Sequence, residues 1–188
     1  GFYVGYNNFS NITNPLIFKG GNNIHRNNII TNLSTKTYEW YRGDLYYQLP
    51  QNYWGTTDTT IIDQMIIDFY DRPDLGVVMY QPILEVPSDT AHGFPWKIHI
   101  NDVNPQDSTL DPFGPESVKF DVFFNRAMDT SFTPLLTFGV KYPYTQHIIN
   151  DSSSWNADST IWTAYHTIGL ETGDGLNYLR VADAVDNE

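Results

Sequence analysis

An asparagine-rich pattern that recurs along the first third of this 188-residue chain is the strongest constraint on its fold. Nine asparagines fall between Gly1 and Leu33. Residues 7–12 (Asn-Asn-Phe-Ser-Asn-Ile) are echoed by residues 27–33 (Asn-Asn-Ile-Ile-Thr-Asn-Leu), and again by residues 52–55 (Asn-Tyr-Trp-Gly). A period of roughly 20–25 residues is typical of a solenoid, in which each repeat stacks on the one before it.

Asparagine suits the tight corners of such a coil, because it tolerates a left-handed backbone and its side chain can bond to neighbouring turns. We therefore expect equivalent asparagines to stack as a ladder along the solenoid. Short apolar segments such as residues 16–18 (Leu-Ile-Phe) would be the strands between corners. Segment 37–49 is longer and richer in aromatic residues than a plain coil, so we expect it to bulge outward as a loop.

The repeated Asn-Asn corners and the run at residues 52–58 (Asn-Tyr-Trp-Gly-Thr-Thr-Asp) resemble the end of right-handed parallel β-helix proteins of the pectate-lyase-like type. The resemblance implies that residues 1–86 are terminal coils with their cap. It also implies that the catalytic coils of any enzyme of this type would precede Gly1.

Residues 59–71 predict an amphipathic helix that would cover the apolar end of the coils, with Asp58 or Thr59 as N-cap. One apolar face recurs with helical spacing at Ile61, Ile62, Met65, Ile66 and Phe69. The opposite face, where we expect solvation, carries Asp63, Gln64, Asp68 and Asp71. Pro73 would stop the helix, and residues 76–80 read as a strand. A membrane or partner helix is the alternative, but the basic face of such helices is missing.

After a predicted linker at residues 87–95, the pattern changes to period-two alternation. Alternating or β-rich runs occur at residues 96–100, 118–124, 136–140, 161–168 and 179–181. Such runs, separated by loops rich in Pro, Gly, Asp and Ser, predict an antiparallel sandwich of roughly seven strands.

Residues 124–129 (Phe-Asn-Arg-Ala-Met-Asp) are similar to a phrase of bacterial immunoglobulin-like domains in large surface proteins. Residues 172–175 (Thr-Gly-Asp-Gly), before a Leu-x-Tyr-Leu-x-Val strand, fit the same pattern. The resemblance implies an immunoglobulin-like β-sandwich over residues 96–188. Residues 182–188 look like the turn before a last strand that is missing or begins beyond the chain, so we expect the sandwich to be incomplete and the chain to be a fragment. The predicted class is therefore all-β, a β-helix end followed by a β-sandwich.

Charge and composition exclude several function classes. The net charge is −12; residues 1–50 carry four basic and two acidic residues, which leaves six basic and twenty acidic residues in the remainder. Such an acidic chain repels nucleic acid and anionic membranes. No apolar run reaches the roughly 18 residues of a membrane span, so we expect no membrane insertion. Charged residues make up only 17%, and Asn, Thr, Ser and Tyr take their place, as is common in β-rich secreted or cell-surface proteins. Cysteine is absent, which excludes a disulfide framework but not secretion.

We find no catalytic, cofactor-binding or metal-binding motif in the chain. The five histidines are scattered, and we expect solvation rather than catalysis from the acidic residues of the predicted helix. Calcium is the strongest small-ligand hypothesis, because four oxygen-bearing side chains fall close together at Asp102, Asn104, Asp107 and Asp111. The alternative is a polar turn that uses these side chains for backbone hydrogen bonds.

Glycan binding needs exposed aromatic side chains near polar groups. The predicted bulge offers such a set, with Tyr38, Trp40 and Tyr41 as proposed contacts and Tyr46 and Tyr47 nearby. Trp155, in a serine-rich segment, is another candidate. We expect Trp54 and Trp96 to pack at the cap and in the first strand of the sandwich.

The leading hypothesis is a non-catalytic structural or adhesive module of a secreted or cell-surface protein, on a bacterial or archaeal cell. The alternative is the C-terminal part of a β-helix protein that binds or degrades polysaccharide, and a third is the ectodomain of a receptor. The expected partners are an extracellular polysaccharide or a surface protein. Because the first coils would expose an apolar cross-section and strand edges, we also expect end-to-end self-association.

Overall fold

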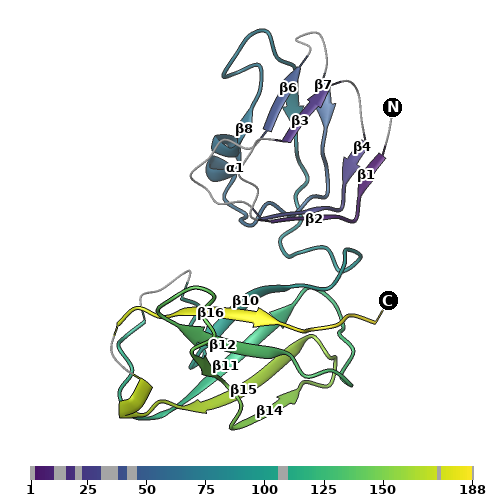
Figure 1. Cartoon of the computed structure of the whole chain (residues 1–188). Helices are drawn as coiled ribbons and strands as arrows, with labels where there is room; N and C mark the ends of the chain where they lie inside the picture. The colour runs from purple at the N-terminus through teal and green to yellow at the C-terminus, as the bar shows by residue number, and fades with distance from the viewer. Residues whose placement is uncertain are drawn as a thin grey trace. The chain divides into compact units, whose positions relative to one another are not determined.

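A computed structural model describes residues 3–10, 16–19, 23–30, 38–41, 46–105, 110–172 and 175–187, and at residues 3, 4, 10, 16–19, 23, 30 and 38–41 it describes the backbone alone. The chain divides into two compact units, Gly1–His92 and Gly93–Glu188 (Figure 1). Within the described ranges the protein is built of strands, apart from one short α-helix and one 3-10 turn. The predicted all-β class is therefore confirmed.

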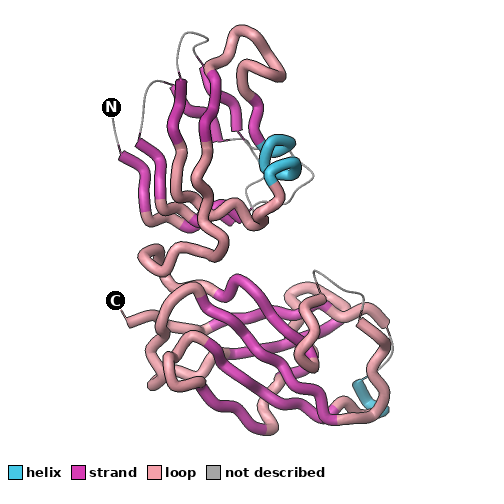
Figure 2. Tube along the Cα trace, turned by 180° about the vertical axis from the view of Figure 1, so that it is seen from behind, coloured by secondary structure: helices cyan, strands magenta, loops and turns pink. Residues whose placement is uncertain are grey.

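The first unit is made of short strands, and later strands pair in parallel with earlier ones as the chain winds. They are β1 (Tyr3–Gly5), β2 (Asn8–Ser10), β3 (Leu16–Lys19), β4 (Asn23–His25), β5 (Asn28–Ile30), β6 (Tyr38–Tyr41), β7 (Tyr46–Gln48), β8 (Ile66–Ile67) and β9 (Val77–Met79). The neighbours are β1 with β4, β2 with β5, β3 with β6 and then β8, and β7 with β9, all parallel. Figure 2 shows these short strands side by side in the first unit.

Two expectations for this unit were wrong. Segment 37–49 does not bulge outward over its described residues, because β6 and β7 take regular places in the parallel sheets and Tyr47 is buried. The helix α1 (Thr59–Met65) begins with Asp58 as its N-cap but ends well before Pro73. Ile66 and Ile67 instead pair with Tyr38 and Glu39, and this non-local pairing outweighs the local helical pattern.

A ladder of asparagine side chains joins three successive turns, as the repeat predicted. The Asn27 Oδ1 atom accepts hydrogen bonds from the backbone N and the Nδ2 of Asn7, both at 3.1 Å. The Asn52 Oδ1 atom accepts the same two bonds from Asn27, both at 3.0 Å. Asn52 Nδ2 then donates to the carbonyls of Ile24 and Leu49 at 3.0 and 2.9 Å. Asn27 and Asn52 are fully buried, so the ladder provides partners for polar groups that water cannot reach.

The left-handed backbone of each corner lies one residue earlier than we expected. The residue before each ladder asparagine has a positive φ: 62° at Tyr6, 57° at Arg26 and 58° at Gln51. The asparagine side chain bridges that residue, because Asn7 Nδ2 donates to the Gly5 carbonyl at 2.8 Å and Asn27 Nδ2 to the His25 carbonyl at 3.1 Å. The asparagine therefore stabilises the left-handed turn without adopting it.

The backbone keeps the same register for one turn beyond the side-chain ladder. Tyr53 N donates to the Asn27 carbonyl at 2.9 Å, and Leu84 N donates to the Asn52 carbonyl at 3.0 Å. Ile83 therefore takes the position that asparagine holds in the earlier turns. It has no carboxamide to continue the ladder and packs against the apolar core of the unit instead.

A second asparagine pair fixes the end of the first unit. Asn28 Nδ2 donates to Asn8 Oδ1 at 2.8 Å, and Asn28 Oδ1 accepts from Ser88 N at 2.5 Å. Asn8 Nδ2 donates to the His92 carbonyl at 2.7 Å. Residues 88–92, which we placed in a linker, are therefore bonded to β2 and β5, and the boundary between the two units follows them.

The second unit consists of two antiparallel sheets that share one core. One sheet has the order β10 (Pro95–Ile100), β11 (Ser117–Phe124), β15 (Ile161–Thr167), β14 (Ser152–Trp155). The other has the order β13 (His147–Ile148), β12 (Leu135–Gly139), β16 (Tyr178–Ala182), and the 3-10 turn η1 (Leu170–Thr172) precedes β16. Alternate residues of β11 point into the core, together with Leu136, Phe138 and Trp162. The period-two runs thus form strands as predicted, whereas β13 and β14 were missed because they are short and polar.

The ladder predicts a specific loss of stability. In Asn27→Ala and Asn52→Ala, buried backbone and side-chain groups lose their partners, at roughly 1–3 kcal/mol for each group. We expect each variant to lower the free energy of unfolding of the first unit by about 2 kcal/mol or more, measured by calorimetry or denaturant titration. Asn150→Ala, at an exposed position of the second unit, is the control. Stability equal to that of the control would contradict a structural role for the ladder.

Candidate functional site

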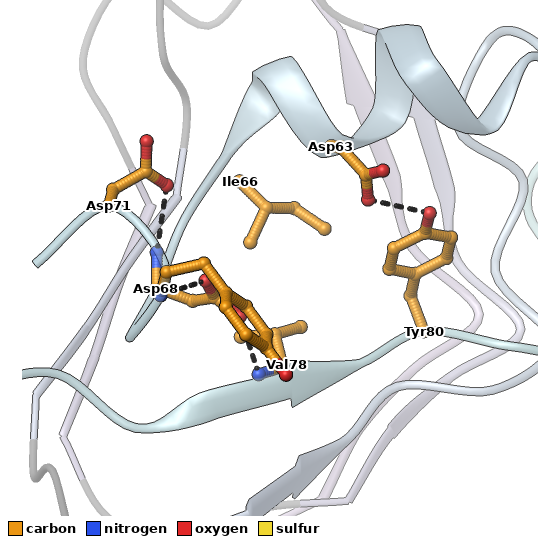
Figure 3. A pocket seen from close by; sticks show the side chains of 7 residues that line it. Asp63, Ile66, Asp68, Asp71, Val78 and Tyr80 are labelled. Atoms are coloured by element: carbon orange, nitrogen blue, oxygen red, sulfur yellow. Dashed lines mark hydrogen bonds between the residues drawn. The ribbon is translucent and has the colours of Figure 1, made fainter. Parts of the chain in front are cut away.

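A polar pocket of about 380 Å³ opens beside α1 in the first unit. Its lining comes from α1, from β8 and the turn after it, and from β9 and the residue after it: Asp63, Ile66, Asp68, Tyr70, Asp71, Val78 and Tyr80. In the view of Figure 3, Ile66 lies between an Asp63–Tyr80 pair on one side and Asp68 and Asp71 on the other. The pocket therefore gathers three carboxyl groups and two phenols from separate segments of the chain.

Asp68 holds the backbone of the pocket together. We expected it to be solvated on a helix, but it lies in the turn after β8 and is only 7% exposed. Its carboxylate accepts from Tyr70 N at 3.0 Å and from Val78 N at 2.9 Å (Figure 3). Because both oxygens are engaged by backbone amides, Asp68 acts as a structural anchor.

Asp63 and Tyr80 form the second polar pair of the pocket. The Tyr80 hydroxyl donates to Asp63 Oδ1 at 2.7 Å, and its ring packs edge-on against buried Trp54, with ring centroids 6.0 Å apart. Burial, and then the Asp63 carboxylate, raise the pKa of Tyr80 to about 12. The phenol therefore stays protonated at neutral pH and serves as a hydrogen-bond donor.

The rim of the pocket is aromatic and acidic. Tyr70 is 83% exposed and packs edge-on against Phe69, with centroids 5.9 Å apart. Asp71 is exposed, and its Oδ2 accepts from Asp68 N at 3.3 Å. Carboxylates beside an exposed ring suit a polyhydroxylated ligand better than an anion. Over the described residues, no three His, Cys, Asp or Glu side chains gather in a way that could hold a metal ion.

The aromatic residues proposed as glycan contacts lie elsewhere. Tyr38, Trp40 and Tyr41 are in β6, a central parallel strand, and their side chains are outside the described residues. Trp155 is half-buried, in β14, and its ring packs on Phe124 with centroids 5.4 Å apart, so it is a poor contact for a ligand.

The loop proposed for calcium is engaged by a cation of the protein itself. The Asp102 carboxylate accepts from Lys119 Nζ at 2.7 Å, and this bond lowers the pKa of Asp102. The same ammonium lies 2.9 Å from Asp121. Asp111 is exposed, and Asp107 is outside the described residues. The Lys119 ammonium thus competes with any divalent cation for Asp102.

The pocket could not have been found from the sequence pattern. Asp63 and Asp68 were singled out, but as solvated residues of one helix. Tyr70 and Tyr80 were not singled out, because Tyr80 meets Asp63 only after the chain turns back between β8 and β9. The one available signal was that Asp63 and Asp68 lie close together in the sequence. In the structure only Asp63 is on α1, because the helix ends before Asp68.

Comparisons of the chain with protein-family models, with curated proteins and with solved structures give no match. In the part of the chain that the structure describes, the helix is too short and too polar to cross a membrane.

Tyr80 gives the pocket a measurable titration. Its ordinary pKa is 10.0 and its pKa in the folded protein is about 12, so the folded state binds this proton more tightly than the unfolded state. The stability that it contributes is complete below pH 10 and is lost as the pH rises through 12. We expect Asp63→Asn to lower this pKa, and Asp71→Asn, which lies outside the hydrogen bond, to leave it unchanged.

The measurement is the ultraviolet absorbance of tyrosinate against pH, with the Tyr80→Phe variant subtracted to isolate this residue from the other tyrosines. A Tyr80 titration that is the same in Asp63→Asn and in the unsubstituted protein would show that the 2.7 Å contact does not control the phenol.

Proposed function

We propose that the chain is a non-catalytic structural and adhesive module of a secreted or cell-surface protein. In this proposal the first unit is the end of a right-handed parallel β-helix with α1 in its cap, and the second is an immunoglobulin-like β-sandwich. The observation that carries the proposal is the asparagine ladder, in which the fully buried side chains of Asn27 and Asn52 join one turn of the chain to the next.

The polar groups of the pocket support the same proposal. The Asp68 carboxylate is bonded to two backbone amides, and the Asp63 carboxylate accepts a hydrogen bond from the Tyr80 hydroxyl. A general acid and base pair needs carboxyl groups that are free to exchange protons with a substrate. Carboxylates that hold a loop and a phenol in place fit a scaffold better than a hydrolytic site.

The second candidate function is that of a part of a protein that binds or degrades polysaccharide. The specific observation in its favour is that the highly exposed ring of Tyr70 lines the same pocket as the carboxylates of Asp63 and Asp71. Aromatic and carboxylate groups are the usual contacts of sugar rings and hydroxyls.

An assay for polysaccharide cleavage distinguishes the structural and adhesive function from the polysaccharide-degrading one. We expect the full chain to release neither reducing ends nor unsaturated products from xylan, pectate, laminarin or chitin, since the carboxylates of the pocket are already engaged. Reducing-sugar and ultraviolet assays measure the two kinds of product. Activity that disappears in Asp63→Asn or Asp71→Asn would overturn the structural proposal in favour of the enzymatic one, and Asp158→Asn, an exposed change in the second unit, is the control.

The strands β1, β2 and β3 lead us to propose that the chain also associates with copies of itself. Among the described residues, β1, β2 and β3 pair along one edge only. Asn7 Oδ1 accepts no bond from the described residues, whereas the same atom of Asn27 and of Asn52 accepts two. An open strand edge with a free acceptor favours addition of another chain.

We therefore expect concentration-dependent association in sedimentation velocity. A positive charge at the open edge, in Asn7→Lys, should reduce it, whereas Asn150→Lys adds the same charge at an exposed position of the second unit and should not. A chain that stays monomeric at the highest concentration reached would rule out this mode of association.

A further inference from the structure

Three tyrosine rings form a contiguous cluster at one end of β12 and β16 in the second unit. We call Tyr142, Tyr144 and Tyr178 the tyrosine platform. The Tyr144 ring lies between the other two, 5.9 Å from the Tyr142 centroid and 4.9 Å from the Tyr178 centroid. Tyr142 is 80% exposed and Tyr178 50% exposed. Exposed aromatic rings are common singly, but a group of three in contact marks a binding surface.

The loop that carries two of these rings is held in one conformation. The Gln146 side chain bonds both backbone groups of Lys141: Lys141 N donates to its Oε1 at 3.1 Å, and its Nε2 donates to the Lys141 carbonyl at 2.9 Å. Tyr144 N donates to the same carbonyl at 2.8 Å, and Tyr144 has a φ of 64°. A strained backbone held by a side-chain clamp is pre-organised for a ligand.

Gly139 is part of this clamp. It ends β12 opposite Tyr178, and a Cβ built on it would overlap the Gln146 carboxamide. The glycine therefore makes room for the side chain that fixes the tyrosine loop. Because the overlapping group is the end of a flexible side chain, an alanine here would displace the clamp and leave the sheet in place.

The chemistry of the platform fits sugars. The hydroxyls of the three tyrosines make no hydrogen bond to the described residues, so they remain free to bond a ligand, and their ring faces can pack against the C–H face of a sugar. The exposed side chain of Lys141 adds a polar group at the rim. A purely apolar partner would leave these hydroxyls without a partner, at a cost in affinity.

The size of the platform also favours a sugar over a protein. An aromatic side chain has roughly 150–250 Å² of surface, so the exposed parts of three rings offer on the order of 300 Å². A stable complex between proteins buries about 800 Å² on each partner. The platform is thus too small for a lasting protein interface, and it matches a short stretch of a glycan chain.

We propose that the tyrosine platform is a glycan-binding surface. The proposal gives a ligand class to the adhesive part of the proposed function, on which it rests, and it assigns binding to the second unit. Tyr142 and Tyr178 supply stacking surfaces, and Tyr144, Gln146 and Gly139 hold the platform in shape.

The test is affinity electrophoresis and a glycan array with the full chain, with xylan, pectate, laminarin and chitin fragments as probes. We expect at least one probe to bind. Tyr142→Ala should weaken binding about tenfold, as loss of a central aromatic contact usually does. Tyr142→Trp should retain it, and Gly139→Ala, which displaces the clamp, should weaken it with all three rings present.

Tyr46→Ala is the matched control, since Tyr46 is 74% exposed in the first unit. Circular dichroism of each variant separates lost binding from lost folding, and Tyr142 is exposed enough for its removal to be tolerated. No binding to any probe, or full binding in a Tyr142→Ala/Tyr178→Ala double variant, would overturn the proposal. Binding lost only in Asp63→Asn would place the ligand in the pocket of the first unit, again overturning it.

The result of this binding test can be told apart from the result of the turnover test of the proposed function. Turnover that depends on Asp63 or Asp71 contradicts the non-catalytic role and leaves the platform standing, provided that the tyrosine variants still lose binding. Absence of turnover together with absence of binding leaves the structural role and removes the platform.

Discussion

The first unit depends on buried carboxamides that pass hydrogen bonds from one turn of the chain to the next. A parallel stack of short strands leaves corner amides and carbonyls without strand partners, and at Asn27 and Asn52 water cannot reach them. Asn27 and Asn52 meet both needs, because each side chain has one acceptor and one donor group. The left-handed residue before each asparagine can then be of any type, as Tyr6, Arg26 and Gln51 show. Asparagine recurs at the corners, and glycine does not, because the preceding residue adopts the left-handed backbone while the asparagine side chain makes the hydrogen bonds.

This arrangement explains how much of the first unit could be predicted from sequence. The spacing of the Asn-Asn corners was enough to predict the ladder, because equivalent corners must hold the same side chain for the carboxamides to meet. The end of α1 could not be predicted, because Ile66 and Ile67 continue the helical apolar pattern. Their strand pairing depends on Tyr38 and Glu39 of β6, far earlier in the chain, and no local pattern contains that information.

In the second unit, period-two alternation located the strands that bury one face, since alternate residues of β11, β12 and β15 fill the core. It missed β14, whose serines are exposed, and it gave no sign of the tyrosine platform. Tyr142 and Tyr144 stand close in the sequence, but Tyr178 joins them only because β16 pairs with β12. The proposed contacts at Tyr38, Trp40 and Tyr41 were chosen for local aromatic density, which does not distinguish a packed strand from an exposed surface.

The pocket of the first unit and the tyrosine platform of the second use their polar side chains in opposite ways, and this difference bears on where a ligand would bind. In the first unit the ladder asparagines, Asp68 and Asp63 are bonded within the protein, so a ligand there would have to compete with existing hydrogen bonds. On the platform the side chain of Gln146 is committed to the backbone, and that commitment leaves the tyrosine hydroxyls and rings free. A ligand that binds the platform gains contacts without breaking any, and for this reason we assign stability to the first unit and recognition to the second.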